Sequence, residues 1–228
     1  MKTYYTDKQY KELLSKMCIL CQTNEQVNDH ILDYFDNKGI KYRQRAIGEG
    51  DYGFLIEASP ELGFPMDTFF TDELFIQRKN SLEELAHSLY GQKKKRSDGR
   101  TEYDDAFLRE LKRARNKKHK YLLVEQPSGW DGILSHDYPN NYSEKSFWGT
   151  LHRLEVDYGL RIKFVSRENM ALEIYTICKY VLDSEIARQE YAGIKRIYKA
   201  VQKAYSMGLV SGQRGKGFVS ALPFDRFI

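Results

Sequence analysis

The residues best suited to chemistry in this chain are Asp51, Gln77, Lys79 and Glu83. An apolar run leads into the second and third of these, so we expect Gln77 and Lys79 to lie on a strand and to point to the same side of it. Asp51 opens a neighbouring predicted strand and can meet them there. An acid, a second oxygen ligand and a lysine around one phosphodiester are typical of Mg²⁺-dependent hydrolysis. Glu83 follows one helical turn later.

The elements that must position these residues alternate between helices and strands. This order predicts an α/β domain with a mixed, mostly parallel sheet. Apolar runs predict strands at residues 17–21, 42–47, 52–56, 74–78, 121–124 and 160–165. Helical spacing predicts helices at residues 7–16, 26–37, 103–117, 143–158 and 171–186. Ser81 and Glu84 predict a further helix that begins with a capping box. We expect the second and third strands to flank the turn at residues 48–51 as a hairpin.

The wider pattern resembles the XPF-type nuclease domain, a family of structure-specific excision-repair endonucleases in the PD-(D/E)xK superfamily. Its signature is Gly-Asp, then Glu-Arg-Lys, then an acid four residues later. Gly50-Asp51 matches the first part, Gln77-Arg78-Lys79 matches the triplet except for its glutamine, and Glu83 matches the last acid. The resemblance covers about residues 17–183 and is closest to phage-encoded members. It implies a restriction-endonuclease-like mixed sheet flanked by helices.

The same resemblance implies a role for each matching residue. Asp51 would bind Mg²⁺ or Mn²⁺, and Gln77 stands in the place of a second metal ligand. Lys79 would orient the attacking water or contact the scissile phosphate. Arg78 would pair with an acid or a phosphate, and Glu83 would help to hold the constellation. The exit of the first strand adds two positions to the implied metal site, Gln22 and Glu25, and the apolar strand ending in Glu125 resembles the family's central strand.

Glutamine occupies two positions, 22 and 77, at which the family carries acids. An amide keeps an oxygen acceptor but loses the negative charge, and charge is most of what a carboxylate offers a hard dication. Two explanations stay open. Either a parental glutamate was deliberately replaced at position 77, or the chain is a natural degenerate member that binds DNA without cutting it. The second altered position favours natural drift.

The positive charge of this chain is concentrated rather than spread. The formal net charge is +4 and the pI is about 8.7, a balance compatible with nucleic acid. Residues 93–96 and 113–120 are dense in Lys and Arg, so either segment could lie along a phosphate backbone. We expect the first segment to be a mobile loop. Its DNA-binding candidates are Lys93, Lys94, Lys95 and Arg96.

The C-terminal 45 residues have a pattern of their own, which divides the chain into a nuclease-like domain, 1–183, and an appendage, 184–228. Two helices joined by a turn near Gly193, followed by a hairpin, resemble a winged helix. The alternative is a helix that packs on the domain or forms a dimer, followed by a basic hairpin. The DNA-binding candidates of this appendage are Lys195, Arg196, Lys199 and Lys216.

Composition limits the class of protein. A chain of 228 residues with 41% hydrophobic and 30% charged residues can form one large domain, or a domain with a small appendage. Three cysteines, Cys18, Cys21 and Cys178, predict reduced thiols rather than a disulfide framework. The absence of an apolar run of ~20 residues and of a signal-peptide pattern predicts a soluble, cytoplasmic protein. We expect it to be encoded by a phage or mobile element in a bacterial cell.

The favoured hypothesis is therefore a metal-dependent endonuclease that hydrolyses phosphodiester bonds in branched or nicked DNA. The alternative is a catalytically inactive nuclease-fold protein that binds DNA, and a third class is a protein-interaction module. DNA is the expected partner, and no membrane is. Homodimerisation is common in the resembled family and stays open for this chain.

Overall fold

The computed structural model describes residues 5–25, 27–90, 92–95, 101–104 and 106–206. It divides into two compact units, each considered by itself. The first, Thr6–Asp183, holds the sheet and all of the residues around Asp51. The second begins at Ser184, within the last helix, and includes the chain ends.

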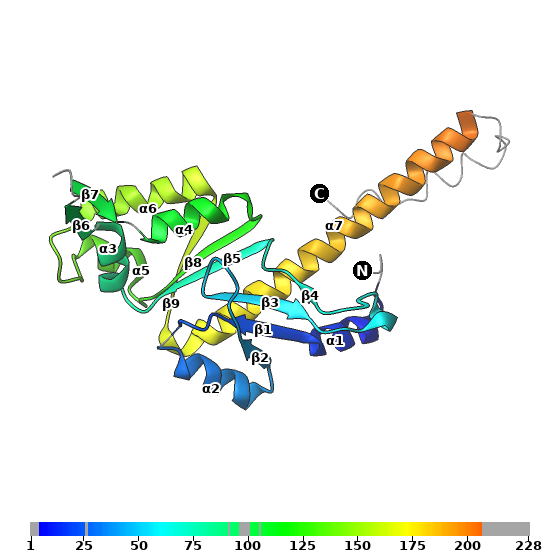
Figure 1. Cartoon of the computed structure of the whole chain (residues 1–228), viewed down its shortest axis with the longest axis horizontal. Coiled ribbons are helices and arrows are strands. Elements are labelled where there is room, and N and C mark those ends of the chain that lie inside the picture. The colour runs from blue at the N-terminus through cyan, green and yellow to red at the C-terminus, as the bar shows by residue number, and fades with distance from the viewer. Residues whose placement is uncertain (1–4, 26, 91, 96–100, 105, 207–228) are drawn as a thin grey trace. The chain divides into compact units, whose positions relative to one another are not determined.

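A seven-stranded mixed sheet forms the centre of the first unit (Figure 1). The sequence predicts a mixed sheet and six of these strands, but it misses β4, and the sheet is not mostly parallel, because three of its six pairings are antiparallel. Its main order is β2-β1-β3-β5-β8-β9, and β4 pairs with β3. β3 runs antiparallel to both β1 and β5, whereas β5, β8 and β9 are parallel. The strands are β1 (Met17–Cys21), β2 (Lys41–Gln44), β3 (Tyr52–Ile56), β4 (Thr68–Phe69), β5 (Leu74–Lys79), β8 (His119–Glu125) and β9 (Leu160–Val165).

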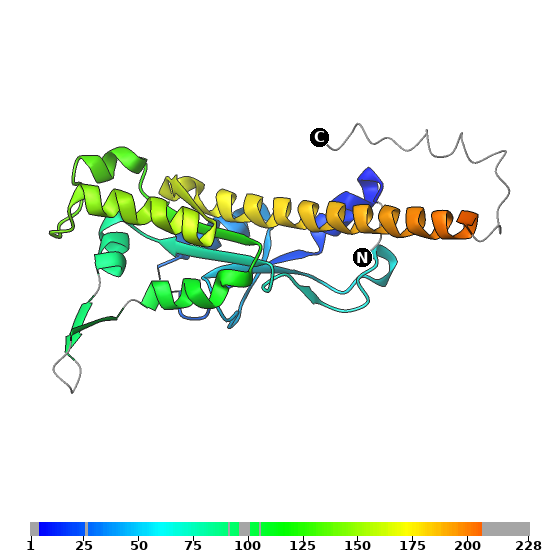
Figure 2. The ribbon, with the colours of Figure 1, turned by 90° about the horizontal axis from the view of Figure 1, so that it is seen from above.

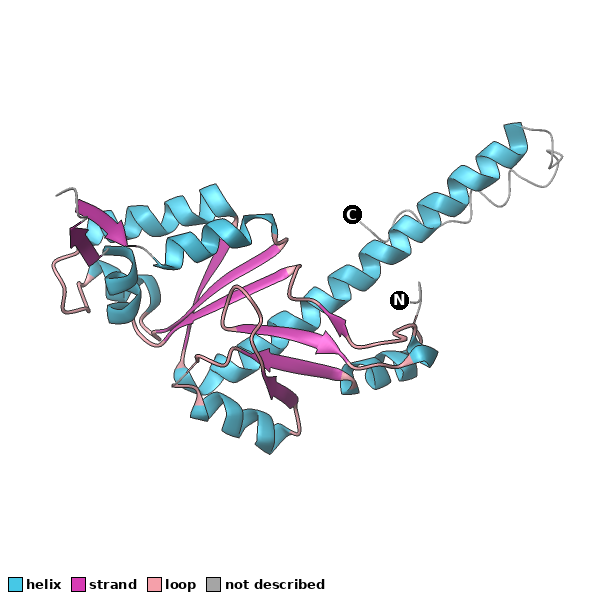
Figure 3. Ribbon diagram, viewed as in Figure 1, coloured by secondary structure: helices cyan, strands magenta, loops and turns pink. Residues whose placement is uncertain are grey.

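Helices cover the sheet on both sides. Figure 2 shows α6 and the start of α7 on one side of the strands and α4 on the other, and Figure 3 separates helices from strands by colour. No helix in the described part of the chain is long and apolar enough to cross a membrane. The α-helices are α1 (Asp7–Ser15), α2 (Asp29–Lys38), α3 (Leu82–Tyr90), α4 (Ala106–Arg113), α5 (Gly129–Leu134), α6 (Glu144–Tyr158) and α7 (Met170–Ser206).

The core explains why the central strands lie where they do. Phe75, Leu122 and Val124 of β5 and β8 are fully buried and belong to one apolar cluster with α3 to α6. Burial of each such side chain contributes about 1.5–3 kcal/mol. β8 is apolar on both faces because helices cover both, as in other strands at the centre of parallel sheets.

Three sequence-based expectations about local structure are wrong. Residues 42–47 and 52–56 do not form a hairpin, because β1 lies between β2 and β3 and pairs with both. All five residues of β1 are buried, so this strand needs a neighbour on each side. Residues 93–95 are not a loop: they belong to β6 (Gln92–Lys95), which pairs with β7 (Thr101–Asp104). The following helix therefore begins at Ala106 rather than at residue 103.

The expected turn near Gly193 is also wrong. The backbone is helical without interruption from Met170 to Ser206. One glycine inside a helix costs only about 1 kcal/mol relative to alanine, and the flanking residues are good helix formers. The helix-turn-helix part of the winged-helix hypothesis is thereby removed. The hairpin expected after residue 207 lies outside the described residues, and the domain boundary at residue 183 stays a prediction.

Candidate active site around Asp51

Gly50 allows β3 to start close against β5. Its φ of +95° lies in the left-handed region, and a Cβ atom at this position would lie 2.9 Å from the carbonyl oxygen of Ile76. The next residue, Asp51, donates its main-chain N–H to that same oxygen across 2.7 Å. A side chain at position 50 would therefore push the two strands apart. The Gly-Asp pair is needed to bring Asp51 beside Gln77.

The Asp51 carboxylate is held by the edge of β5. Its Oδ2 accepts a hydrogen bond from Gln77 Nε2 at 2.5 Å and another from the Arg78 main-chain N–H at 2.7 Å. The main-chain oxygen of Asp51 accepts from the N–H of Gln22 at 2.8 Å. The structure thus brings together three segments that the sequence analysis singled out: the exit of β1, the start of β3 and the end of β5.

Asp51 is an acid in an unfavourable environment for charge. Burial raises its pKa to about 8, and the negative charges of Glu25 and Glu110 add to the rise. The Arg78 N–H and the charge of Lys79 act in the opposite direction; both are weaker influences than burial and Glu25, though larger than Glu110. Without a bound cation, the carboxyl group is therefore mostly protonated at neutral pH.

Arg78 is a buried clamp. Its guanidinium donates to Glu25 Oε1 at 2.5 Å, to Glu125 Oε1 at 3.1 Å and to the carbonyl oxygen of Val27 at 2.6 Å. The side chain is only 2% exposed. An Arg taken out of water is stable only when its donors are satisfied, and here two acids and a carbonyl satisfy them. The prediction that Arg78 pairs with an acid agrees with this geometry.

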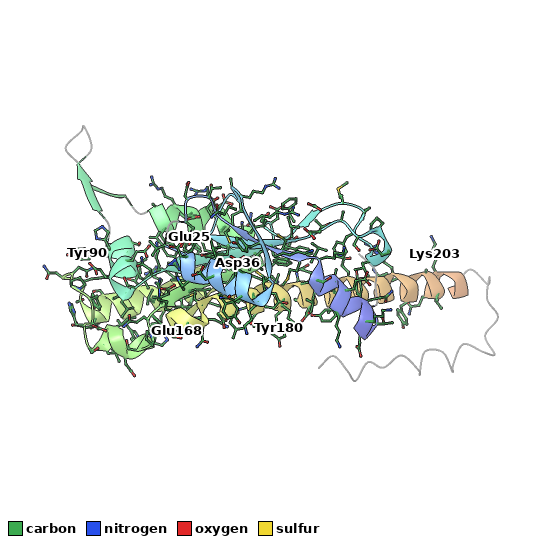
Figure 4. The ribbon with its side chains drawn as sticks, turned by 90° about the horizontal axis from the view of Figure 1, so that it is seen from below. Glu25, Asp36, Tyr90, Glu168, Tyr180 and Lys203 are labelled. Atoms are coloured by element: carbon green, nitrogen blue, oxygen red, sulfur yellow. The ribbon has the colours of Figure 1, made fainter. Side chains whose placement is uncertain are left out.

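Glu125, at the end of β8, is the acid at the centre of this clamp. Besides Arg78, it is contacted by His30 Nε2 at 2.8 Å and by an Arg167 guanidinium nitrogen at 3.3 Å. The Glu125 side chain is 4% exposed. This network links β5 and β8 to the start of α2, and Glu25 lies just before that helix (Figure 4).

Lys79 points to the other side of β5 from Arg78 and belongs to the site. Its Nζ donates to Glu84 Oε1 at 3.1 Å and lies 5.9 Å from the centre of the Phe107 ring. It is close enough to Asp51 to favour the ionised carboxylate. Gln77 and Lys79 therefore lie on the same side of β5, as the alternation of strand side chains predicts, and Gln77 contacts Asp51 directly.

Glu83 is not part of this group. It is exposed and faces a surface pocket lined by His136 and Asp137, whereas Glu84 contacts Lys79. Ser81 Oγ accepts from the Glu84 N–H, and the Glu84 carboxylate turns back to accept from the Asn80 N–H. Ser81 therefore caps the helix as predicted. The Glu84 carboxylate, however, accepts from the Asn80 N–H instead of the Ser81 N–H, so the predicted capping box is not completed.

A family comparison identifies the fold's relatives. The ERCC4 domain model matches residues 22–178, more than half of the chain. The chain belongs to the ERCC4 domain family. This membership confirms the resemblance to XPF-type nuclease domains.

Solved structures give weaker matches to this ERCC4 domain. XPF from Aeropyrum pernix is 17% identical, with a TM-score of 0.49 over 76% of this chain and 69% of that one. The same protein in complex with DNA is 18% identical, with a TM-score of 0.47 over 73% and 66% of the two chains. No curated protein matches.

The oxygen atoms around Asp51 in this ERCC4 domain fit a divalent cation. Gln77 Oε1 is buried and has no hydrogen-bond partner among the described residues. An orphaned oxygen of this kind costs about 1–3 kcal/mol, and a cation would satisfy it. Glu25 supplies a second carboxylate close to Asp51. In the described part of the chain, no three His, Cys, Asp or Glu side chains form a metal site, so a complete ligand set would include the Gln77 amide.

Gln22 lies beside this oxygen cluster but is already engaged. Its Oε1 accepts from the main-chain N–H of Thr23 at 3.1 Å and of Ile47 at 3.3 Å. These contacts brace the loop that leads to Gly50. Gln22 as a metal ligand stays a prediction, and its amide oxygen would have to leave both contacts to bind a cation.

The predicted DNA-binding residues fall into two groups, one within the matched residues 22–178 and one beyond them. Residues 93–95 lie on β6, and Arg196 and Lys199 are exposed on α7. Lys195 also falls within α7. Arg96 and Lys216 lie outside the described residues. Their roles stay predictions.

Sequence reasoning missed several residues that the fold places at the site. Glu84 could have been chosen over Glu83 from the capping signal alone, because the acid at the third helical position turns back toward the helix start. Glu110, Phe107 and His30 lie far from the motif in sequence, and no local pattern marks them. Only the packing of α2 and α4 brings them close to β5.

Proposed function

We propose that this ERCC4 domain hydrolyses phosphodiester bonds in branched or nicked DNA with the help of Mg²⁺ or Mn²⁺. The observation that supports the proposal most is the contact between Asp51 and Gln77 at the junction of β3 and β5. The charge of Lys79 acts on the same acid, and the buried Gln77 Oε1 has no hydrogen-bond partner among the described residues. Two acids, an amide and a lysine in one place supply the groups that this reaction requires.

The residues divide the work according to their contacts. Asp51, Glu25 and the Gln77 oxygen would hold the cation, which supplies Lewis acidity and lowers the pKa of a bound water. The Arg78 N–H keeps the Asp51 carboxylate oriented, and the Arg78 guanidinium does the same for Glu25. Lys79, held by Glu84, places a positive charge where the attacked phosphate gains negative charge.

Gln77 weakens this arrangement but does not remove it. A glutamate at the same position would add one negative charge next to the cation and would not donate to Asp51. We therefore expect the Gln77→Glu variant to bind Mn²⁺ more tightly and to cut faster than the protein with Gln77.

A second candidate function rests on the same hydrogen bond. The Gln77 amide donates to an acid whose pKa is raised to about 8, so the pair is stable without a cation at neutral pH. This geometry suits a protein that binds DNA without cutting it. Such a protein would lose affinity steeply with salt and show no metal-dependent cleavage.

A nuclease assay separates the two functions. Forked, nicked and four-way DNA would be incubated with Mg²⁺ or Mn²⁺ and the wild-type, Gln77→Glu or Lys79→Ala protein. The proposal expects cleavage by the first two and none by Lys79→Ala, whose DNA binding stays nearly intact. Cleavage that survives Lys79→Ala would remove the assignment of the site. Binding without cleavage by both the wild-type and Gln77→Glu proteins would favour the second function.

A further inference from the structure

The segment from Arg109 to Lys120 carries more net positive charge than the whole chain. It contains seven Lys or Arg residues and one acid, Glu110, whereas the formal charge of the protein is +4. The rest of the molecule is therefore slightly negative on balance. A polyanion would be attracted to this segment rather than to the surface in general.

This segment covers most of α4, the short 3-10 helix that follows it, η2 (Ala114–Asn116), and the first two residues of β8. One side packs into the core through Phe107, Leu111 and Ala114. Arg109, Lys112 and Arg113 are exposed, and their spacing puts them on the opposite side of the helix. The helix thus has one apolar face and one basic face.

Three contacts fix α4 beside the candidate site. Glu110 Oε1 accepts the main-chain N–H of Gly50 at 2.7 Å, immediately before Asp51. The Phe107 ring lies under Lys79. Arg113 Nε contacts Glu49 Oε1 at 3.3 Å. The helix that presents the basic face is therefore tied to the turn that carries the metal-binding acid.

The cations of the segment have different surroundings. Lys117 and Lys120 turn inward, where their ammonium groups donate to carbonyl oxygens. Lys112 and Arg115 are exposed, and neither forms an ion pair with a described residue. Arg113 remains 60% exposed despite its contact with Glu49. These last three side chains can neutralise phosphates without first breaking a buried interaction.

We propose that this basic face (Arg109, Lys112, Arg113 and Arg115) binds the phosphate backbone of a duplex arm of the DNA next to the bond that is cut. The rise from Arg109 to Arg113 on α4 and on to Arg115 on η2 totals about 10 Å, which is about three phosphate steps of one strand along the duplex axis. The inference rests on DNA being the substrate or ligand. It adds the position of the duplex, along α4, to the proposed function.

Charge reversal of Lys112 and Arg115 tests the inference. We would measure the affinity of the Lys112→Glu/Arg115→Glu protein for a forked duplex by fluorescence anisotropy, in EDTA so that no cutting occurs, at several salt concentrations. Each lost phosphate contact lowers the slope of log affinity against log salt by about 1. We therefore expect a slope smaller by about 2 and clearly weaker binding at every salt concentration.

Lys8→Glu/Lys11→Glu is the matched control. Both lysines are exposed, three residues apart, on α1, which precedes β1, whereas Asp51 lies beyond the other end of that strand. The control changes the net charge equally. If it weakens binding as much as the α4 variant does, the effect is one of overall charge and the inference is wrong. Thermal unfolding of both variants would verify that they fold, with Lys112→Gln/Arg115→Gln as a milder second variant.

The outcomes also separate this inference from the proposed function. Normal DNA binding by both α4 variants, together with cleavage that depends on Lys79, would support the proposed nuclease function and show that the basic face does not bind DNA. If the α4 variants bind DNA more weakly and the protein cuts under no condition, the DNA-binding role of the basic face is supported and the second function is favoured. Tighter binding of a duplex RNA than of the DNA by the wild-type protein would overturn DNA as the occupant.

Discussion

Arg78 Nε donates to Glu125 Oε1 across 3.1 Å inside the protein, where both side chains are almost fully buried. The main-chain N–H of the same Arg78 holds the Asp51 carboxylate. Residue 78 therefore connects the end of β8 to the candidate metal site. Glu125, through Arg78, can thereby influence where Asp51 and Glu25 lie.

We expect Glu125→Ala to destabilise the fold strongly. It leaves Arg78 buried with one partner fewer, and breaking a buried ion pair costs about 3–5 kcal/mol. Urea unfolding would measure the change, with Glu57→Ala as the control. Glu57 pairs with Lys41 and Arg43, which are half exposed, so its loss should cost less than about 1 kcal/mol. Equal losses of unfolding free energy in Glu125→Ala and Glu57→Ala would contradict the role of Glu125 in holding Arg78. Glu125→Gln should lose less stability than Glu125→Ala because it keeps a hydrogen-bond acceptor.

The stability of the metal-free protein should depend on pH through Asp51. Its folded pKa of about 8 lies above its ordinary value of 3.8, so between these values the folded state keeps a proton that the unfolded chain has released. The stability from this group is full below pH 4 and is lost as the pH rises through 8. Asp51→Asn should therefore be more stable than the wild type at pH 9 and similar at pH 4. Thermal unfolding in EDTA would measure this; a difference that does not change with pH would contradict the raised pKa.

Gly50→Ala should damage the fold more than Gly48→Ala does. Both glycines have a positive φ, and alanine in that conformation costs about 1–2 kcal/mol. At position 48 a Cβ atom meets nothing within 4 Å, but at position 50 it lies 2.9 Å from Ile76 O. The difference in unfolding free energy between the two variants, measured in urea, gives the cost of the clash between a Cβ atom at position 50 and β5. Equal effects would mean that the two strands separate without cost.

Glu84, rather than Glu83, should support Lys79. We expect Glu84→Ala to lower both the stability, by the loss of its contact with the Asn80 N–H, and the rate of cleavage. Glu83→Ala removes an exposed side chain one position earlier on the same helix and should leave both unchanged. Unfolding curves and single-turnover cleavage of the two proteins would decide between them. A larger effect of Glu83→Ala than of Glu84→Ala would instead favour Glu83, the residue expected from the family signature.

The sequence predicts the order of most elements because their apolar spacing is local. The cap at Gly39 and the limits of β3, β9 and α6 agree with that spacing within one residue. Which strands pair with β2 and β3 could not be predicted in the same way. Strand pairing depends on which buried strand needs a neighbour, and β1 separates two segments that are adjacent in sequence.

By itself, the sequence determined the family and the motif, because both depend on residue types at fixed spacing: Asp51 after Gly50, and Lys79 two residues after Gln77. Only the tertiary structure decided what surrounds them. It placed Glu125 and His30 behind Arg78, and Glu110 of α4 against Gly50. Such contacts join residues 47 to 95 positions apart, and they form only when helices and strands bury their apolar faces together.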